Sequence, residues 1–324
     1  MMKVRLLATV TVLALGMMAT GTAHADMFGS GENTFTLDFV TVGNPGNAAQ
    51  SAANRSHSET GGDGYGAVPH EYRMSTYAIS QNDITTATAA GLLNVTAGAH
   101  TGDRPAANIS WYEAAAFVNW LNTSQGHQAA YDLTWGGSSW SMALWSSEDA
   151  WQSGGENRFR HKDAYYFLPS EDEWYKAAFF DYDPDDPTYY LYATGSDTAP
   201  TAVASGTTAD TAVYGGQSGP ADVNQSGGLS PYGTMGQGGN VWEWSESASD
   251  GSNNSASGDR AVRGGFWLDT VFDVRSSGRL VVVPTVEVGG IGFRVASIPE
   301  PSTTLLVLMA GGALLLKKRL SRSL

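Results

Sequence analysis

The feature that most limits how this chain can fold is a missing residue type, because none of its 324 residues is a cysteine. The fold cannot be held by disulfides, and site chemistries that need a thiolate, as a metal ligand or as a nucleophile, are excluded. Hydrophobic residues make up 42% of the chain and charged residues 15%, which is too apolar for a disordered protein. Stability must therefore come from a packed core, which a chain of this length can supply.

The N-terminal residues 1–25 have the three parts of a secretory signal peptide. Lys3 and Arg5 form a positive n-region, residues 6–19 form an apolar h-region, and residues 23–25 form a small-x-small cleavage site. We expect cleavage before Asp26 and export through the inner membrane. A retained membrane anchor is the alternative, and the well-formed cleavage site argues against it.

The C-terminal residues 299–324 contain a second targeting pattern. Pro299-Glu300-Pro301 precedes the apolar residues 302–316, and the basic residues 317–319 follow. A helix of this length spans roughly 22 Å, which is shorter than a bilayer core of about 30 Å. These pieces resemble the PEP-CTERM sorting signal, which implies a short transmembrane helix that an exosortase recognises and cleaves in Gram-negative bacteria. An ordinary tail anchor is the alternative.

The region between these two ends is strongly acidic. It keeps 12 of the 18 basic residues and 31 of the 32 acidic residues, a net charge of about −19. Such a surface repels phosphate backbones, so we expect no nucleic-acid partner. It attracts divalent cations instead.

Local patterns in this region predict an α+β fold with few short helices, short strands and much irregular structure. Capping boxes at Ser110/Glu113 and at Ser170/Glu173 predict the starts of two amphipathic helices. Residues 34–43, 260–267 and 290–297 are typical of strands. Residues 194–219 and 245–258 are rich in small polar residues and glycine, which predicts surface loops.

Five motifs occur in a fixed order over residues 109–297: "ISWYEAAAFVNWLN", "YFLPSEDEWYKAAFFD", "GGNVWEW", "RAVRGGFW" and "GIGFRVAS". In this order they resemble the formylglycine-generating enzyme (sulfatase-modifying factor) family. The resemblance implies a mixed fold distantly related to C-type lectin-like domains, and we assign it to residues 26–298. It indicates the fold and does not by itself indicate the activity.

The resemblance also implies where an oxidase of this family would bind copper, namely through two cysteines after the Arg-Gly-Gly strand. This chain has Asp269 and Asp273 in that stretch, and copper(I) prefers soft sulfur ligands. We therefore expect no copper and no formylglycine-generating reaction, and we assign no catalytic residue. A carboxylate-based site with Arg275 is an alternative, although a simple Asp273–Arg275 salt bridge is the plainer interpretation.

The "GGNVWEW" box is where the family binds structural calcium. The ligands implied by the resemblance are the backbone carbonyls of Gly236, Gly239 and Val241 and the side chain of Glu243. Calcium accepts carbonyl and carboxylate oxygens at about 2.3–2.6 Å, and glycines let a loop turn its carbonyls inward. The alternative is that Glu243 only pairs with an arginine, such as Arg263 or Arg294. We expect Trp242, Trp244 and Trp267 to lie in the core.

Together these observations predict an exported, non-catalytic protein that acts as a binding or scaffold module. After C-terminal processing it would reside in the periplasm, at the cell surface or in the extracellular matrix. Its expected partners are the exosortase-type sorting machinery, the inner membrane transiently, and exopolysaccharide or envelope proteins. The alternative is an enzyme that modifies exported proteins or glycans without the family's copper chemistry.

Overall fold

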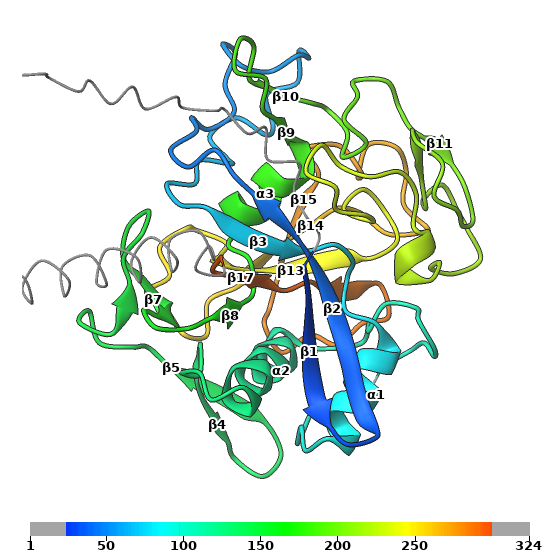
Figure 1. Cartoon of the computed structure of the whole chain (residues 1–324). Helices are drawn as coiled ribbons and strands as arrows, with labels where there is room; N and C mark the ends of the chain where they lie inside the picture. Colours follow the sequence, from blue (N-terminus) through cyan, green and yellow to red (C-terminus); the bar gives the residue numbers. More distant parts are fainter. Residues whose placement is uncertain (1–23, 97, 300–324) are drawn as a thin grey trace, which may run out of the picture.

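The computed structural model describes residues 24–96 and 98–299 (Figure 1). Short strands and short helices are joined by long irregular segments, so the predicted α+β fold is confirmed. Of the residues predicted to form the sorting signal, 299–324, all but Pro299 lie outside the described residues, and so does nearly all of the predicted signal peptide. Within residues 24–96 and 98–299, no helix has the length and apolar character needed to cross a bilayer.

A five-stranded antiparallel sheet joins the two ends of the described chain. Its spatial order is β1 (His24–Ser30), β2 (Asn33–Val42), β3 (Tyr72–Ser75), β17 (Ala296–Ser297) and β8 (Tyr166–Phe167). Arg73, on the central strand β3, links β1 to β17, because its guanidinium donates to the Asp26 carboxylate at 2.7 and 3.0 Å and to Ser297 Oγ at 2.9 Å. The predicted first residue of the mature chain is thus tied to the last strand.

A second, four-stranded sheet carries most of the family motifs. Its order is β15 (Arg279–Val282), β14 (Arg260–Arg263), β13 (Trp242–Ala248) and β16 (Ile291–Phe293), and only the β13–β16 pair is parallel. The "GIGFRVAS" motif therefore supplies one strand to each sheet. Four two-stranded ladders complete the described strands: β4 (Asp132–Trp135) with β5 (Trp140–Ala143), β6 (Ala150–Trp151) with β7 (Asn157–His161), β9 (Phe180–Asp181) with β10 (Thr188–Tyr189), and β11 (Thr201–Ala202) with β12 (Thr211–Ala212).

Three α-helices lie within the described residues, and each begins at a capping box. They are α1 (Gln81–Ala89), α2 (Trp111–Ser124) and α3 (Glu171–Phe179); a 3-10 turn, η1 (Val223–Gln225), follows later. Both predicted helices are confirmed with Ser110 and Ser170 as N-caps. In Figure 1, α3 lies above the central strands and α1 and α2 lie below them.

The sequence patterns misplaced several features. The surface loop predicted for residues 194–219 contains the β11–β12 ladder, and residues 211–214 within it are buried. The helix α1 was not predicted, although Ser80 and Asp83 form a capping box like the other two, because its threonines are weak helix formers. The loop predicted for residues 245–258 is wrong at its start. Residues 245–248 continue β13, and Ser245 and Glu246 are buried, because the sheet extends beyond the apolar part of the motif.

The main hydrophobic core lies between α2 and the two sheets. Trp111, Phe117, Trp244 and Phe293 are fully buried in it. Trp242 is also buried, at 6% exposure, so both tryptophans of the "WEW" motif are core residues as predicted. Trp267, which was predicted to join them, is only partly buried. The tight packing of these rings holds β13 between β14 and β16 and so positions Glu243 and Glu246.

Candidate functional site

The predicted calcium ligands lie in the turn that leads into β13. Gly236 and Gly239 have positive φ angles of 79° and 106°. A Cβ on Gly239 would lie 2.4 Å from the carbonyl oxygen of Val213, so only glycine fits there. Val241 is buried, at 1% exposure, and Glu243 is the second residue of β13. Three of the four predicted residues thus lie in this bend, and Glu243 lies in the strand that follows it.

The Glu243 carboxylate is already paired inside the protein. Arg294 donates from Nε to Oε2 at 2.6 Å and from Nη2 to Oε1 at 2.7 Å. Trp174 Nε1 donates to Oε2 at 2.6 Å. Both charged side chains are at most 1% exposed. Of the two arginines proposed as partners, Arg294 is the observed one, and Arg263 pairs with Glu171 at 2.7 Å instead.

This arrangement does not fit a calcium ion in the predicted position. Both oxygens of Glu243 accept hydrogen bonds from Arg294, so an ion bound there would lie beside a buried guanidinium. Such like-charge proximity in a low-dielectric interior is costly. Within the described part of the chain, no group of three or more acidic or histidine side chains could hold a metal. Calcium at this box stays a prediction, and an ion there would share the Glu243 carboxylate with Arg294.

Chelation of the purified chain distinguishes the two interpretations of Glu243. We expect the same midpoint of thermal unfolding in calcium and in chelator, because the Glu243–Arg294 pair needs no ion. A bound ion at 100 times its dissociation constant would instead add about 2.7 kcal/mol to the free energy of unfolding. A lower midpoint in chelator, with calcium found by elemental analysis, would establish the calcium site.

Asp269 and Asp273, at the position of the family's copper cysteines, cap local turns. Asp269 Oδ2 accepts from the amide of Phe266 at 3.1 Å, and Asp273 Oδ2 accepts from the amide and hydroxyl of Thr270 at 3.0 and 2.7 Å. The predicted Asp273–Arg275 salt bridge is wrong, because Arg275 pairs with Glu59 instead. Burial, together with the charge of Asp273, raises the pKa of Asp269.

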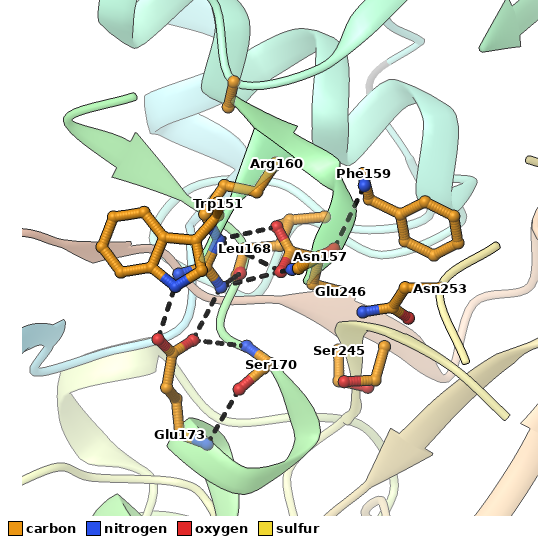
Figure 2. Close-up of polar contacts among 12 residues, drawn as sticks. Trp151, Asn157, Phe159, Arg160, Leu168, Ser170, Glu173, Ser245, Glu246 and Asn253 are labelled. Carbon is orange, nitrogen blue, oxygen red and sulfur yellow. Dashed lines mark hydrogen bonds and ion pairs between the residues drawn. The ribbon is translucent and has the colours of Figure 1, made fainter. Parts of the chain in front are cut away.

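The structure contains a buried ion-pair cluster that the sequence patterns did not reveal. It consists of Arg160 on β7, Glu173 on α3 and Glu246 on β13, and Figure 2 shows Arg160 between the two carboxylates. Arg160 Nη2 lies 2.8 Å from Glu173 Oε2 and 2.7 Å from Glu246 Oε2. All three side chains are at most 2% exposed. One signal existed in the sequence, since Glu173 is also the capping-box residue of α3.

Further donors satisfy the two carboxylates of this cluster. Asn157 and Tyr131 donate to Glu246, while His70 Nε2 lies 2.8 Å from Glu173 Oε1. Burial alone would raise the pKa of Glu173, but Arg160 and His70 hold that pKa well below its usual range. Burial raises the pKa of Glu246 in spite of Arg160. Carboxylates held in this way act as structural anions, since a general acid or base needs an oxygen free to meet substrate.

A cleft of about 290 Å³ opens above this cluster, at the N-terminus of α3. A second ion-pair group lies on its wall, where Glu171 accepts from Arg263 and Arg279 at 2.7 Å each. Trp151 also lines the cleft, yet its ring is covered, with Arg160 5.2 Å from the ring centroid and His70 packed edge-on at 5.2 Å. The cleft is polar, and the Trp151 ring on its wall already packs against Arg160 and His70.

Asp172 also lines this cleft, and the pKa of its carboxyl group is raised. Burial raises its pKa to about 6, and the neighbouring Glu171 and Glu173 add to the effect, although the amide of Gly66 donates to Oδ1 at 2.8 Å. The native carboxyl group therefore keeps its proton to a higher pH than the unfolded one. The free energy of unfolding must fall as pH rises from about 4 to about 6, and this loss is complete above that window.

We expect Asp172→Asn to abolish this loss. At pH 7 the variant should have a free energy of unfolding about 1–3 kcal/mol higher than the parent chain, and the difference should vanish below about pH 4. Urea unfolding at pH 4, 5, 6 and 7 measures the effect. Glu156→Gln, at the exposed rim of the same cleft, controls for charge removal. Equal shifts in both variants, or no shift at pH 7, would contradict the assignment to Asp172.

Comparison with known proteins identifies the fold. Residues 33–298 match the profile of the family described as "Sulfatase-modifying factor enzyme 1-like domain". Among solved structures, Treponema denticola variable protein 1 has a TM-score of 0.55 and 21% identity, and the match covers 86% of this chain and 100% of that chain. The structure titled CarF has a TM-score of 0.56 and 18% identity, and the match covers 82% of this chain and 99% of that chain. PvdO from Pseudomonas aeruginosa has a TM-score of 0.46 and 15% identity, and the match covers 85% of this chain and 98% of that chain. Among curated proteins, none matches the chain.

Proposed function

Since this chain belongs to the sulfatase-modifying factor enzyme 1-like domain family, we propose that it is an exported member that binds a ligand without catalysing a reaction. It acts as a binding or scaffold module at the cell surface or in the extracellular matrix. Export rests on the signal-peptide pattern of residues 1–25, and retention or release rests on the PEP-CTERM-like residues 299–324. The exosortase-type machinery and the inner membrane are its transient partners.

One observation carries the non-catalytic part of this proposal: four buried carboxylates around the family motifs are paired with arginines. Each accepts from at least one guanidinium at 3.1 Å or less, and the members of this set are Glu171, Glu173, Glu243 and Glu246. Such pairs stabilise the fold as units, and they occupy these four carboxylates with structural contacts. The chain also lacks cysteine, so the family's copper chemistry has no ligands.

The enzyme alternative receives less support from the same region. One oxygen of each carboxylate, Oδ2, caps a local turn by accepting from the amide of Phe266 (Asp269) or of Thr270 (Asp273). A pair of catalytic carboxylates would need to converge on a bound substrate. Their present role as turn caps accounts for both residues without a substrate.

Capture by envelope material tests the binding part. The purified, labelled chain should co-sediment with envelope or extracellular-matrix fractions of the bacterium that encodes it, well above an unrelated protein of similar size and net charge. Retention that persists in high salt would separate specific binding from charge effects. Absence of capture by every fraction would refute the binding role.

A second assay tests the non-catalytic part. Incubation with copper(I) and a cysteine-containing sulfatase peptide should give no formylglycine by mass spectrometry, because the chain offers no thiolate. Product formation above a no-protein control would overturn this part of the proposal and leave the binding part standing.

A further inference from the structure

We propose that the groove between the β4–β5 hairpin and the N-terminus of α2 binds a neutral saccharide, an inference that rests on the proposed role as a binding module. The groove measures about 440 Å³, which is within the usual range for small-ligand sites. Aromatic, hydroxyl and carboxylate side chains from four separate segments meet in it. Its principal residues are Trp135, Trp140, Tyr112, Ser138, Thr285 and Glu287.

The hairpin presents two indole rings on one side of the groove. Trp135 and Trp140 face each other across the ladder, on either side of a Gly-Gly-Ser-Ser turn in which Gly137 has a φ of 92°. Their ring centroids are 5.2 Å apart at an interplanar angle of 60°. Trp140 Nε1 donates to the carbonyl of Asn94 at 2.9 Å, which fixes the hairpin against the opposite wall. Trp135 remains 37% exposed and offers a supported aromatic face.

The opposite wall supplies carboxylate and hydroxyl groups but no cationic side chain. Glu113 is used by the fold, because Oε1 accepts from the amide of Thr96 at 2.8 Å and Oε2 accepts from the amide of Ser110 at 2.9 Å. Glu287 is exposed at the rim, so its carboxylate can accept from a ligand hydroxyl. The residues that line the groove include no lysine, arginine or histidine. An anionic ligand would therefore find carboxylates without a counter-charge.

These groups suit a neutral saccharide better than a cation. The apolar face of a sugar ring can cover the exposed indole, and its hydroxyls can pair with serine, threonine and carboxylate oxygens. A cation is held best when several aromatic faces surround it. Here the two indoles meet edge to face at one corner.

The other aromatic residues near polar clefts are less suited to this role. Trp151 has its ring covered by Arg160 and His70. Trp242 and Trp244 are buried at 6% and 0% exposure. Trp135 therefore combines exposure, a rigid support and a neighbouring groove, which these three tryptophans do not.

Titration of the purified chain with cellotetraose, maltotetraose and tetra-N-acetylchitotetraose tests the groove, with indole fluorescence and saturation-transfer NMR as readouts. At least one neutral tetrasaccharide should bind, and Trp135→Ala should weaken it at least about tenfold, equal to ~1.4 kcal/mol. Trp135→Phe should retain much of the affinity because it keeps a ring. Tyr182→Ala, which removes an aromatic side chain that is 49% exposed elsewhere, should leave binding unchanged.

A galacturonate tetramer and tetralysine complete the ligand set. The galacturonate tetramer, which is an anion, should not bind. Glu287→Gln should change the affinity for the neutral saccharide by less than about fivefold, because the amide still accepts a hydrogen bond. The inference is overturned if no neutral tetrasaccharide binds, if Trp135→Ala binds as well as the parent chain, or if tetralysine binds and is lost in Glu287→Gln. Envelope capture that survives in a correctly folded Trp135→Ala chain would refute the groove and leave the proposed binding role intact.

Discussion

Replacing Arg160 with methionine is expected to lower the free energy of unfolding by about 3–5 kcal/mol. The substitution keeps much of the side-chain volume but removes the cation that Glu173 and Glu246 share. Glu246, which is 0% exposed, would remain buried without the guanidinium that balances its charge, and Glu173 would keep its contact with His70 but lose Arg160. The guanidinium also lies 3.7 Å from the ring centroid of Phe167, so a cation–π contact is lost as well. Urea unfolding followed by circular dichroism measures the effect.

Arg158 provides the matched control, since it lies two residues earlier on the same strand. Its Nε donates to the carbonyl of Trp145 at 2.9 Å, and its side chain is only partly buried. Arg158→Met should cost less than about 1 kcal/mol, as is usual for a replacement near the surface. If the two variants lost similar stability, the cluster around Arg160 would not be the structural centre that its geometry indicates.

Replacing Glu243 with glutamine is the second large change, with an expected loss of about 3–5 kcal/mol. The amide cannot neutralise Arg294, which is fully buried and receives both its short carboxylate contacts from Glu243. The contact with Trp174 Nε1 would also lose its ionic acceptor. Thermal and urea unfolding of the variant measure the loss.

Glu59→Gln serves as the control for this ion pair. Glu59 pairs with Arg275, and their side chains are 33% and 20% exposed, so the substitution should cost less than about 1 kcal/mol. The double variant Glu243→Gln/Arg294→Met should be more stable than the sum of the single losses predicts, because each single change strands a buried charge. Strict additivity would show that the two residues do not act as a pair.

Much of the fold could be predicted because its signals are local. The capping boxes at Ser110 and Ser170 operate within four residues, and both helices begin where these pairs place them. The strand of residues 33–42 could be predicted because apolar and polar residues alternate along it, and pairing with β1 buries alternate side chains. The unpredicted α1 shows the limit of this reasoning, since tertiary packing of Ile84 and Ala87 outweighs the low propensity of its threonines.

The candidate sites could not be predicted to the same extent, because their contacts join distant segments. Glu246 contacts Arg160, which lies 86 residues away in the sequence. Trp135 lines a groove whose other wall comes from α2 and from the loop after α1. In the sequence Glu246 looked like part of a surface loop, since its neighbours are small and polar. Burial of the strand that carries it is a property of the whole sheet.

The amino-acid sequence alone decided which ligands this chain lacks, because a chain without cysteine offers no thiolate to a metal such as copper. It also decided where its motif-bearing helices begin. The folded chain decided which charges meet. Glu243 had two plausible arginine partners in the sequence, and only packing of β13 beside β16 brings Arg294 to it, while β14 turns Arg263 toward Glu171. Ion pairs between residues far apart in the chain depend on the register of sheets, which no short motif encodes.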